Sequence, residues 1–194
     1  MKGKSAESSR EVYISVDIEA AGPFPPKYSM LSLGACEVDN SENSFYVEMK
    51  PINRSFIKKA ISVGGFSIES LMRSGTDPSE AMKLFKKWII KTSGNNVPVF
   101  VGFNAPFDWQ YVNWYFFEFI GSNPFGINAL DIKAYYMGIS GTNWLNTSSS
   151  KLPEWLRRKD KIKHHALSDA VAQGEIFHKL LLRNSEIHEH EIRR

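Results

Sequence analysis

Three strand-like segments follow one another within the first 51 residues, and their close spacing constrains the fold more than any other feature. Residues 11–20 alternate β-branched with other side chains, and residues 29–39 and 44–51 are similarly typical of strands. A Gly- and Pro-rich loop at 21–28 joins the first two, and a turn is predicted at 40–43. Because the connections are this short, the three strands must form an antiparallel meander.

The rest of the chain alternates helix-like and strand-like patterns. The apolar run VPVFVGFN at 97–104 is typical of a strand buried on both faces. Residues 128–138 begin as a strand and turn helical, and residues 138–163 read as a polar loop around a short helical piece. Caps and apolar spacing predict helices at 67–75, 77–94, 105–121 and 166–183. This order predicts an α/β fold, with helices on the faces of a mixed sheet.

The bulk properties indicate one folded domain. The chain has 194 residues, 42% of them hydrophobic, so it is long enough to bury a core. We assign residues 11–183 to the domain and expect a flexible tail at 1–10 and a polar tail at 184–194. The net charge of +3 permits a polyanionic partner without identifying one.

Cellular location is predicted from the N-terminus and from cysteine usage. The segment MKGKSAESSR lacks the apolar core of a secretory signal, and no apolar run reaches the length of a membrane span. The single cysteine, Cys36, excludes an internal disulfide, and its apolar neighbours predict a buried thiol. These features predict a cytoplasmic protein with no membrane partner.

Two acids on the first predicted strand raise the question of a cation. Asp17 and Glu19 are two residues apart, so their side chains share one face of the strand. Two carboxylates side by side on an otherwise buried strand repel each other and resist desolvation, and such a pair usually needs a compensating cation. The alternative is an ordinary strand with one solvated face.

Two further acids sit at predicted helix starts. Asp108 follows the apolar strand at 97–104, and Asp169 follows His164 by five residues. Each alone is also explained as a first-turn acid that complements the helix dipole. Together with the pair on the first strand they suit Mg²⁺ or Mn²⁺, and two such ions could clamp a phosphodiester while a neutral histidine accepts a proton from water.

Three motifs, in this order, resemble the DEDDh (DnaQ-like) family of 3′–5′ exonucleases, which includes the proofreading subunit of bacterial DNA polymerase III, RNase T and oligoribonuclease. SVDIEAAG followed by MLSLGACEV resembles the first motif, FVGFNAPFD the second and HHALSDAVAQGEIF the third. GGFS at 64–67 resembles the segment that the family places beside its substrate. The likeness runs from about Val12 to Leu182. It implies an RNase H-like fold with a five-stranded mixed sheet in the order 3-2-1-4-5.

The resemblance assigns roles to individual residues. The acids that would hold two divalent ions, Mg²⁺ or Mn²⁺, are Asp17, Glu19, Asp108 and Asp169. His164 would be the general base, while His165 lies at the spacing where the related DEDDy enzymes place a tyrosine.

The expected substrate contacts are Ala20, Phe24, Phe66 and Asn104. Phe24 and Phe66 are candidates for stacking on terminal bases, with an ordinary core role as the alternative. The chain departs from the family at Ala20-Ala21, where members often carry hydroxyl residues, and at Phe103, where many have histidine. The basic stretch WLRRKDKIKHH could contact phosphates or form a solvated loop.

These features predict a metal-dependent enzyme that hydrolyses the terminal phosphodiester of a single-stranded 3′ end and releases nucleoside 5′-monophosphates. The alternative is a catalytically inactive nucleic-acid-binding or scaffolding module on the same fold. The sequence leaves open DNA against RNA as the substrate, processivity, protein partners and the oligomeric state, a homodimer included.

Overall fold

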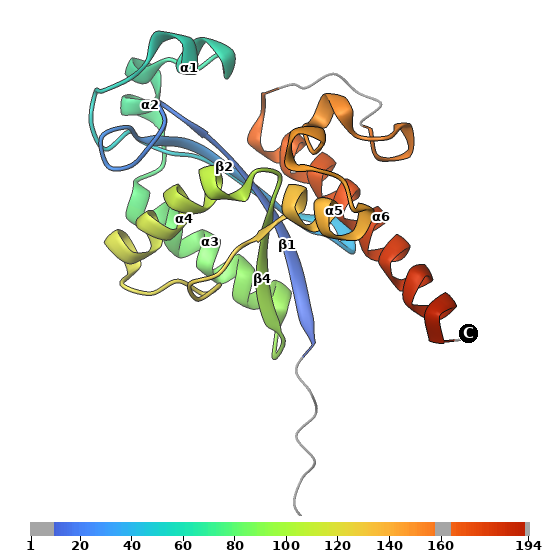
Figure 1. Ribbon diagram of the computed structural model, residues 1–194. Coiled ribbons are helices and arrows are strands. Elements are labelled where there is room, and N and C mark those ends of the chain that lie inside the picture. The colour runs from blue at the N-terminus through green and yellow to red at the C-terminus, as the bar shows by residue number, and fades with distance from the viewer. Residues whose placement is uncertain (1–9, 158–163, 193–194) are drawn as a thin grey trace, which may run out of the picture.

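The computed structural model describes residues 10–157 and 164–192, and within them five strands form one mixed sheet (Figure 1). The strand order is β3-β2-β1-β4-β5, which confirms the predicted topology. The first three strands form the expected antiparallel meander, and β4 and β5 add in parallel beside β1. The strands are β1 (Glu11–Ala20), β2 (Met30–Glu37), β3 (Asn40–Glu48), β4 (Val97–Gly102) and β5 (Leu130–Asp131).

Helices cover both faces of this sheet (Figure 1). They are α1 (Lys58–Val63), α2 (Ile68–Ser74), α3 (Pro78–Ser93), α4 (Ala105–Ile120), α5 (Ile132–Ser140) and α6 (Ala166–Ile192). Three 3₁₀ turns follow α5, namely η1 (Trp144–Asn146), η2 (Ser149–Lys151) and η3 (Glu154–Leu156). None of the helices in the described part of the chain is both long and apolar enough to cross a lipid bilayer.

The alternation of β1 gives its two faces different tasks. Ile14, Val16 and Ile18 are buried in the core that β1 forms with α3 and α4. The intervening side chains face α6, and the buried Ser15 hydroxyl donates to the Ala170 carbonyl at 2.7 Å. Asp17 and Glu19, which continue the face of Ser15, are therefore presented toward the start of α6.

Three elements differ from the sequence-based expectation. The turn predicted at 40–43 is wrong: β3 already begins at Asn40, and the chain reverses at Val38-Asp39. Val38 is buried and its N–H donates to the Tyr13 carbonyl, a tertiary contact that local sequence does not reveal. Helix α1 was not predicted, and α6 continues beyond its expected end at 183 because no Gly or Pro interrupts residues 184–192.

Small residues let α6 lie directly on the sheet. A Cβ atom on Gly34 would lie 2.2 Å from the Leu167 backbone nitrogen, and one on Gly174 would lie 3.2 Å from the Ser15 Cβ. Cys36 is buried in the same contact, as predicted, and burial raises the pKa of its thiol to about 12. The backbone at the start of α6 therefore lies directly against β2, the neighbour of the strand β1 that carries Asp17 and Glu19.

We expect Gly34→Ala to lower the free energy of unfolding by about 2–3 kcal/mol, because the added methyl group meets backbone that cannot rotate away. Gly138→Ala is the matched control: it lies in α5 with nothing within 4 Å of the added carbon, and it should stabilise by about 0.4–1 kcal/mol. Urea denaturation measures both changes. A Gly34→Ala protein as stable as the wild type would contradict the close approach of α6.

Candidate active site

Three side chains from distant parts of the chain converge at the end of β1. Glu19, His164 and Asp169 each offer one ligand atom, and these atoms all lie within 4.8 Å of one another. Glu19 comes from β1, His164 from the segment entering α6, and Asp169 from the first turn of α6. We call these three residues the acidic cluster.

Asp108 lies directly beside this cluster. Its side chain is buried, and its Oδ1 atom accepts a hydrogen bond of 3.1 Å from the backbone N–H of Ile18. Ile18 separates Asp17 from Glu19 on β1, and Asp17 pairs with Gly34, where the start of α6 lies against the sheet. The structure therefore gathers all four predicted acids at one end of the sheet.

Two carboxyl groups of this site, Glu19 and Asp108, resist ionisation. Burial raises the pKa of Glu19 to about 7, and the negative charge of Asp169 adds to the shift. Burial also raises the pKa of Asp108; the N–H groups of Ile18 and of Asp108 itself oppose this shift, whereas Glu19 and Asp131 add to it. Ionising these groups together is unfavourable unless a cation offsets their charge.

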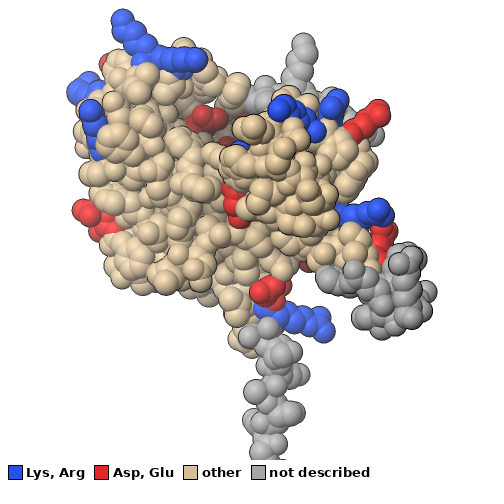
Figure 2. Space-filling view, viewed as in Figure 1, with Lys and Arg blue, Asp and Glu red and all other residues tan. Residues whose placement is uncertain are grey.

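The donor set fits a hard divalent cation. Carboxylate oxygens predominate, as Mg²⁺ and Mn²⁺ prefer, and the one imidazole belongs to an exposed residue, His164. Glu19 and Asp169 are half-buried and His164 is exposed, and Figure 2 shows acidic side chains in a hollow of the viewed face. An ion or a phosphate could reach such a site without opening the core.

The two adjacent histidines point to different places. His164 adopts a positive φ of 47° and joins the acidic cluster. His165 stacks on the ring of Tyr46 in β3, with ring centroids 4.5 Å apart and an angle of 22° between the planes. The left-handed backbone at His164 thus separates the two imidazoles, one toward the acids and one onto the sheet.

The predicted substrate contacts surround the site unevenly. The loop with Gly64 and Phe66 lies close to it, since a Cβ atom on Gly64 would be 2.6 Å from the Phe66 ring and 3.6 Å from Glu19 Oε2. Phe24 is 46% exposed and meets Tyr28 edge-on, so it is available to a ligand. Ala20 is buried, which leaves its backbone as the group that a substrate could reach.

Asn104 and Asp131 fix the start of α4. Asn104 has a φ of 69°, a left-handed conformation that Asn tolerates better than most residues. The Asp131 carboxylate accepts from the N–H of Ala105 at 2.7 Å and from that of Ala134 at 2.8 Å, and so caps α4 and α5 together. Sequence reasoning missed Asp131, although an acid just before a helical pattern is a capping signal.

A buried glutamine was also missed. Gln173 lies one turn after Asp169; its Oε1 accepts from the Phe103 N–H at 2.7 Å and its Nε2 donates to the Val16 carbonyl at 2.8 Å. One side chain thereby ties α6 to β1 and to the segment leading into α4. Its signal in the sequence was a lone amide on the apolar face of the last helix.

Part of the basic stretch WLRRKDKIKHH, residues 158–163, lies outside the described residues, so its predicted contact with phosphates stays a prediction.

A known protein is similar to this chain in sequence. The chain is 45% identical over 171 residues to the 3′–5′ DNA exonuclease Cap18 of Escherichia coli, an alignment that covers 88% of this chain and 91% of the relative. No protein-family model matches the chain.

Solved structures support the same fold. The nuclease domain of 3′hExo, a DEDDh family member bound to rAMP, superposes with a TM-score of 0.70 at 17% identity, over 92% of this chain and 95% of that domain. Cell-death related nuclease 4 gives 0.69 at 15% identity, over 90% and 65% of the two chains. The zinc-bound complex of E. coli ExoI with single-stranded DNA gives 0.66 at 15% identity, over 93% and 42%.

The fold is that of the RNase H-like nucleases. With the 45% identical relative, this shows that the chain belongs to the DEDDh family and is a 3′–5′ exonuclease.

In the absence of metal, the raised pKa of Glu19 predicts that stability falls as pH rises from about 4.5 to about 7. Between these values the folded state keeps a proton that the unfolded chain has lost, so rising pH favours unfolding. We expect Glu19→Gln to raise the free energy of unfolding by on the order of 2 kcal/mol at pH 8 and to change it little at pH 4.

Urea denaturation in EDTA at both pH values tests this expectation, with Glu42→Gln, an exposed change on β3, as the control. An effect of Glu19→Gln that is the same at pH 4 and pH 8 would show that the carboxyl is not held in its neutral form.

Proposed function

We propose that the enzyme hydrolyses the 3′-terminal phosphodiester of single-stranded DNA and releases nucleoside 5′-monophosphates with the help of two divalent cations, Mg²⁺ or Mn²⁺. The convergence of Glu19, His164 and Asp169, with Asp108 beside them, carries this proposal. The 45% identical relative is a DNA exonuclease by name, which supports DNA as the substrate. It also favours an enzyme over the alternative of an inactive binding module.

Each acid has a proposed role. Asp17, Glu19, Asp108 and Asp169 hold the cations. When bound, such ions stabilise the negative charge that develops on the oxygens of the reacting phosphate. The hydrogen bond from Ile18 orients the Asp108 carboxylate, and the fixed start of α6 orients Asp169. The carboxylates are thus held in place before substrate binds, which avoids reorganisation during the reaction.

His164 acts as the general base. Its imidazole accepts a proton from the attacking water as the oxygen of that water forms a bond to phosphorus. The bond between phosphorus and the 3′ oxygen of the preceding nucleotide breaks, and that oxygen gains a proton from solvent. The terminal nucleotide leaves with the phosphate on its 5′ carbon. Phe66 and Phe24 hold its base, and the backbone at Ala20 and the amide of Asn104 hold its sugar and phosphate.

The proposed activity is tested with matched 5′-labelled DNA and RNA oligomers. We expect stepwise shortening of the DNA with Mg²⁺ and none with EDTA, and a 3′-blocked oligomer should resist. Asp108→Asn, which keeps an oxygen to accept from Ile18 but removes the charge, should lower the rate by at least about 100-fold. Cutting of a circular strand would show an endonuclease, and faster digestion of RNA would overturn the assignment of DNA.

The general base is tested by two neighbouring variants. His164→Ala should lower kcat by about 10²–10⁴-fold with little change in KM, because the proton acceptor is lost and the binding groups remain. His165→Ala should change kcat only a few-fold, because His165 packs on Tyr46. A large loss of kcat in His165→Ala together with a small loss in His164→Ala would make His165 the general base.

A further inference from the structure

A lysine and a tryptophan meet beside the start of α4, outside the acidic cluster. The ammonium of Lys133, on α5, lies 4.2 Å from the ring centroid of Trp144, in η1. The same ammonium donates a hydrogen bond of 3.4 Å to Asn104 Oδ1. Three elements therefore contribute one cation, one indole and one amide to a single place, which we call the Lys133–Trp144 unit.

This unit is adjacent to the proposed site. Asn104 is the N-cap of α4, and Asp108 lies one helical turn further along the same helix. Asp131, two residues before Lys133, bonds the N–H of Ala105 and so holds the starts of α4 and α5 together. The fold thus fixes the Lys133–Trp144 unit next to Asp108, whose carboxylate reaches Ile18 near the end of β1.

The unit has the properties of a ligand contact rather than of core. Trp144 is 48% exposed, although large apolar side chains are normally buried. Within the described part of the chain, Lys133 forms no ion pair, and its recorded partners, Asn104 and Trp144, are neutral. A positive charge that pairs with no acid among residues 10–157 and 164–192 and a half-exposed indole are therefore presented together.

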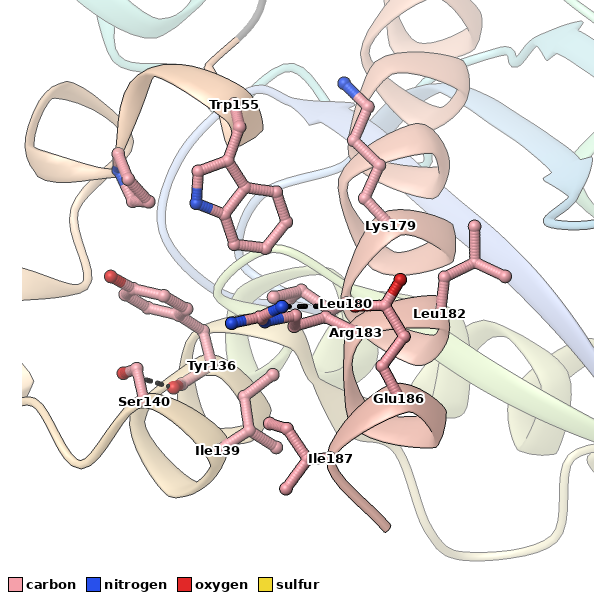
Figure 3. Close-up of a pocket in the computed structure, with 11 residues that line it drawn as sticks. Tyr136, Ile139, Ser140, Trp155, Lys179, Leu180, Leu182, Arg183, Glu186 and Ile187 are labelled. Carbon is pink, nitrogen blue, oxygen red and sulfur yellow. Dashed lines mark hydrogen bonds and ion pairs between the residues drawn. The ribbon is translucent and has the colours of Figure 1, made fainter. Parts of the chain in front are cut away.

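Trp155 provides a contrast within the same segment. It is also 48% exposed, but it lines a separate pocket of about 680 Å³ between α5 and α6 (Figure 3). Two cations line this pocket, Lys179 and Arg183, and Arg183 is paired with Glu186 at 3.1 Å. An exposed indole is thus not unusual here, but at the Lys133–Trp144 unit the ammonium lies directly over the indole ring, 4.2 Å from its centroid.

We propose that the Lys133–Trp144 unit is a subsite for the strand upstream of the scissile phosphodiester, which deepens the proposed function and rests on it. The ammonium contacts a backbone phosphate, and the open face of the indole stacks on a base. Phe66 lies beside Glu19 on β1, whereas the unit lies on α5 and η1, beside the N-cap Asn104 of α4. The terminal nucleotide therefore occupies the Phe66 side, and the rest of the strand leaves over the unit.

Upstream contacts are separated from chemistry by substrate length. We would measure kcat and KM with Mg²⁺ on a DNA 15-mer and on the p-nitrophenyl ester of thymidine 5′-monophosphate, which has no nucleotide upstream of the scissile bond, for Lys133→Met and Trp144→Ala. KM for the 15-mer should rise roughly 5–100-fold, the range that one base–aromatic stack contributes. Values for the p-nitrophenyl ester should stay within twofold. Trp144→Phe keeps an aromatic ring and Lys133→Arg keeps the positive charge, so both should bring KM for the 15-mer most of the way back to the wild-type value.

Binding of the labelled 15-mer in EDTA tests the subsite without hydrolysis. Its affinity should fall in both variants, and Lys133→Met should reduce the slope of log K against log salt by about 0.7, the contribution of one phosphate contact on a single strand. Trp155→Ala is the matched control and should leave affinity and KM unchanged.

Unchanged 15-mer binding, or an equal loss in Trp155→Ala, would overturn the subsite. An equal loss on the p-nitrophenyl ester would place these residues at the terminal nucleotide and overturn the upstream assignment. A wild type that binds the 15-mer through the unit but hydrolyses nothing would instead refute the proposed function alone.

Discussion

The two hydrogen bonds of the Gln173 amide are the interaction on which the geometry of this enzyme depends. They join α6 to the Val16 carbonyl of β1 and to the Phe103 N–H before α4, the three elements that carry the acids. Losing the amide would leave the buried Val16 carbonyl and the partly buried Phe103 N–H unpaired, at up to about 1–3 kcal/mol each. Gly34 of β2 and Gly174 of α6 let the helix lie close to the sheet. Gln173 then fixes the position of α6 relative to β1.

This position of α6 has an electrostatic cost, because it brings several carboxyl groups together. Burial, with a smaller contribution from the charge of Asp169, raises the pKa of Glu19, and burial raises the pKa of Asp108. A protein selected for stability alone would not place several acids at the end of its central strand. The arrangement is understandable if a cation binds there, since the charge that destabilises the metal-free fold becomes the force that holds the ion.

Much of this architecture could be predicted from the sequence, because the motifs combine local patterns with chemistry. The antiparallel meander and the shared face of Asp17 and Glu19 followed from short connections and strand alternation. The sheet order, which is confirmed, and the set of four acids with His164 came from the resemblance to the DEDDh family, and the role of His164 stays a prediction. The turn at Val38-Asp39 could not be predicted, because it depends on a bond from Val38 to Tyr13 that forms only in the folded sheet. Gln173 and the Lys133–Trp144 unit were missed for the same reason, since their partners lie far away in the sequence.

The central claim is that the four acids form one cation site. Diffraction from crystals soaked in Mn²⁺, recorded with the anomalous signal of manganese, tests it most directly. The account predicts two anomalous peaks among the carboxylates of Asp17, Glu19, Asp108 and Asp169, and their loss in Asp108→Asn crystals. Manganese bound only elsewhere, or no peak among these carboxylates at saturating Mn²⁺, would contradict the account.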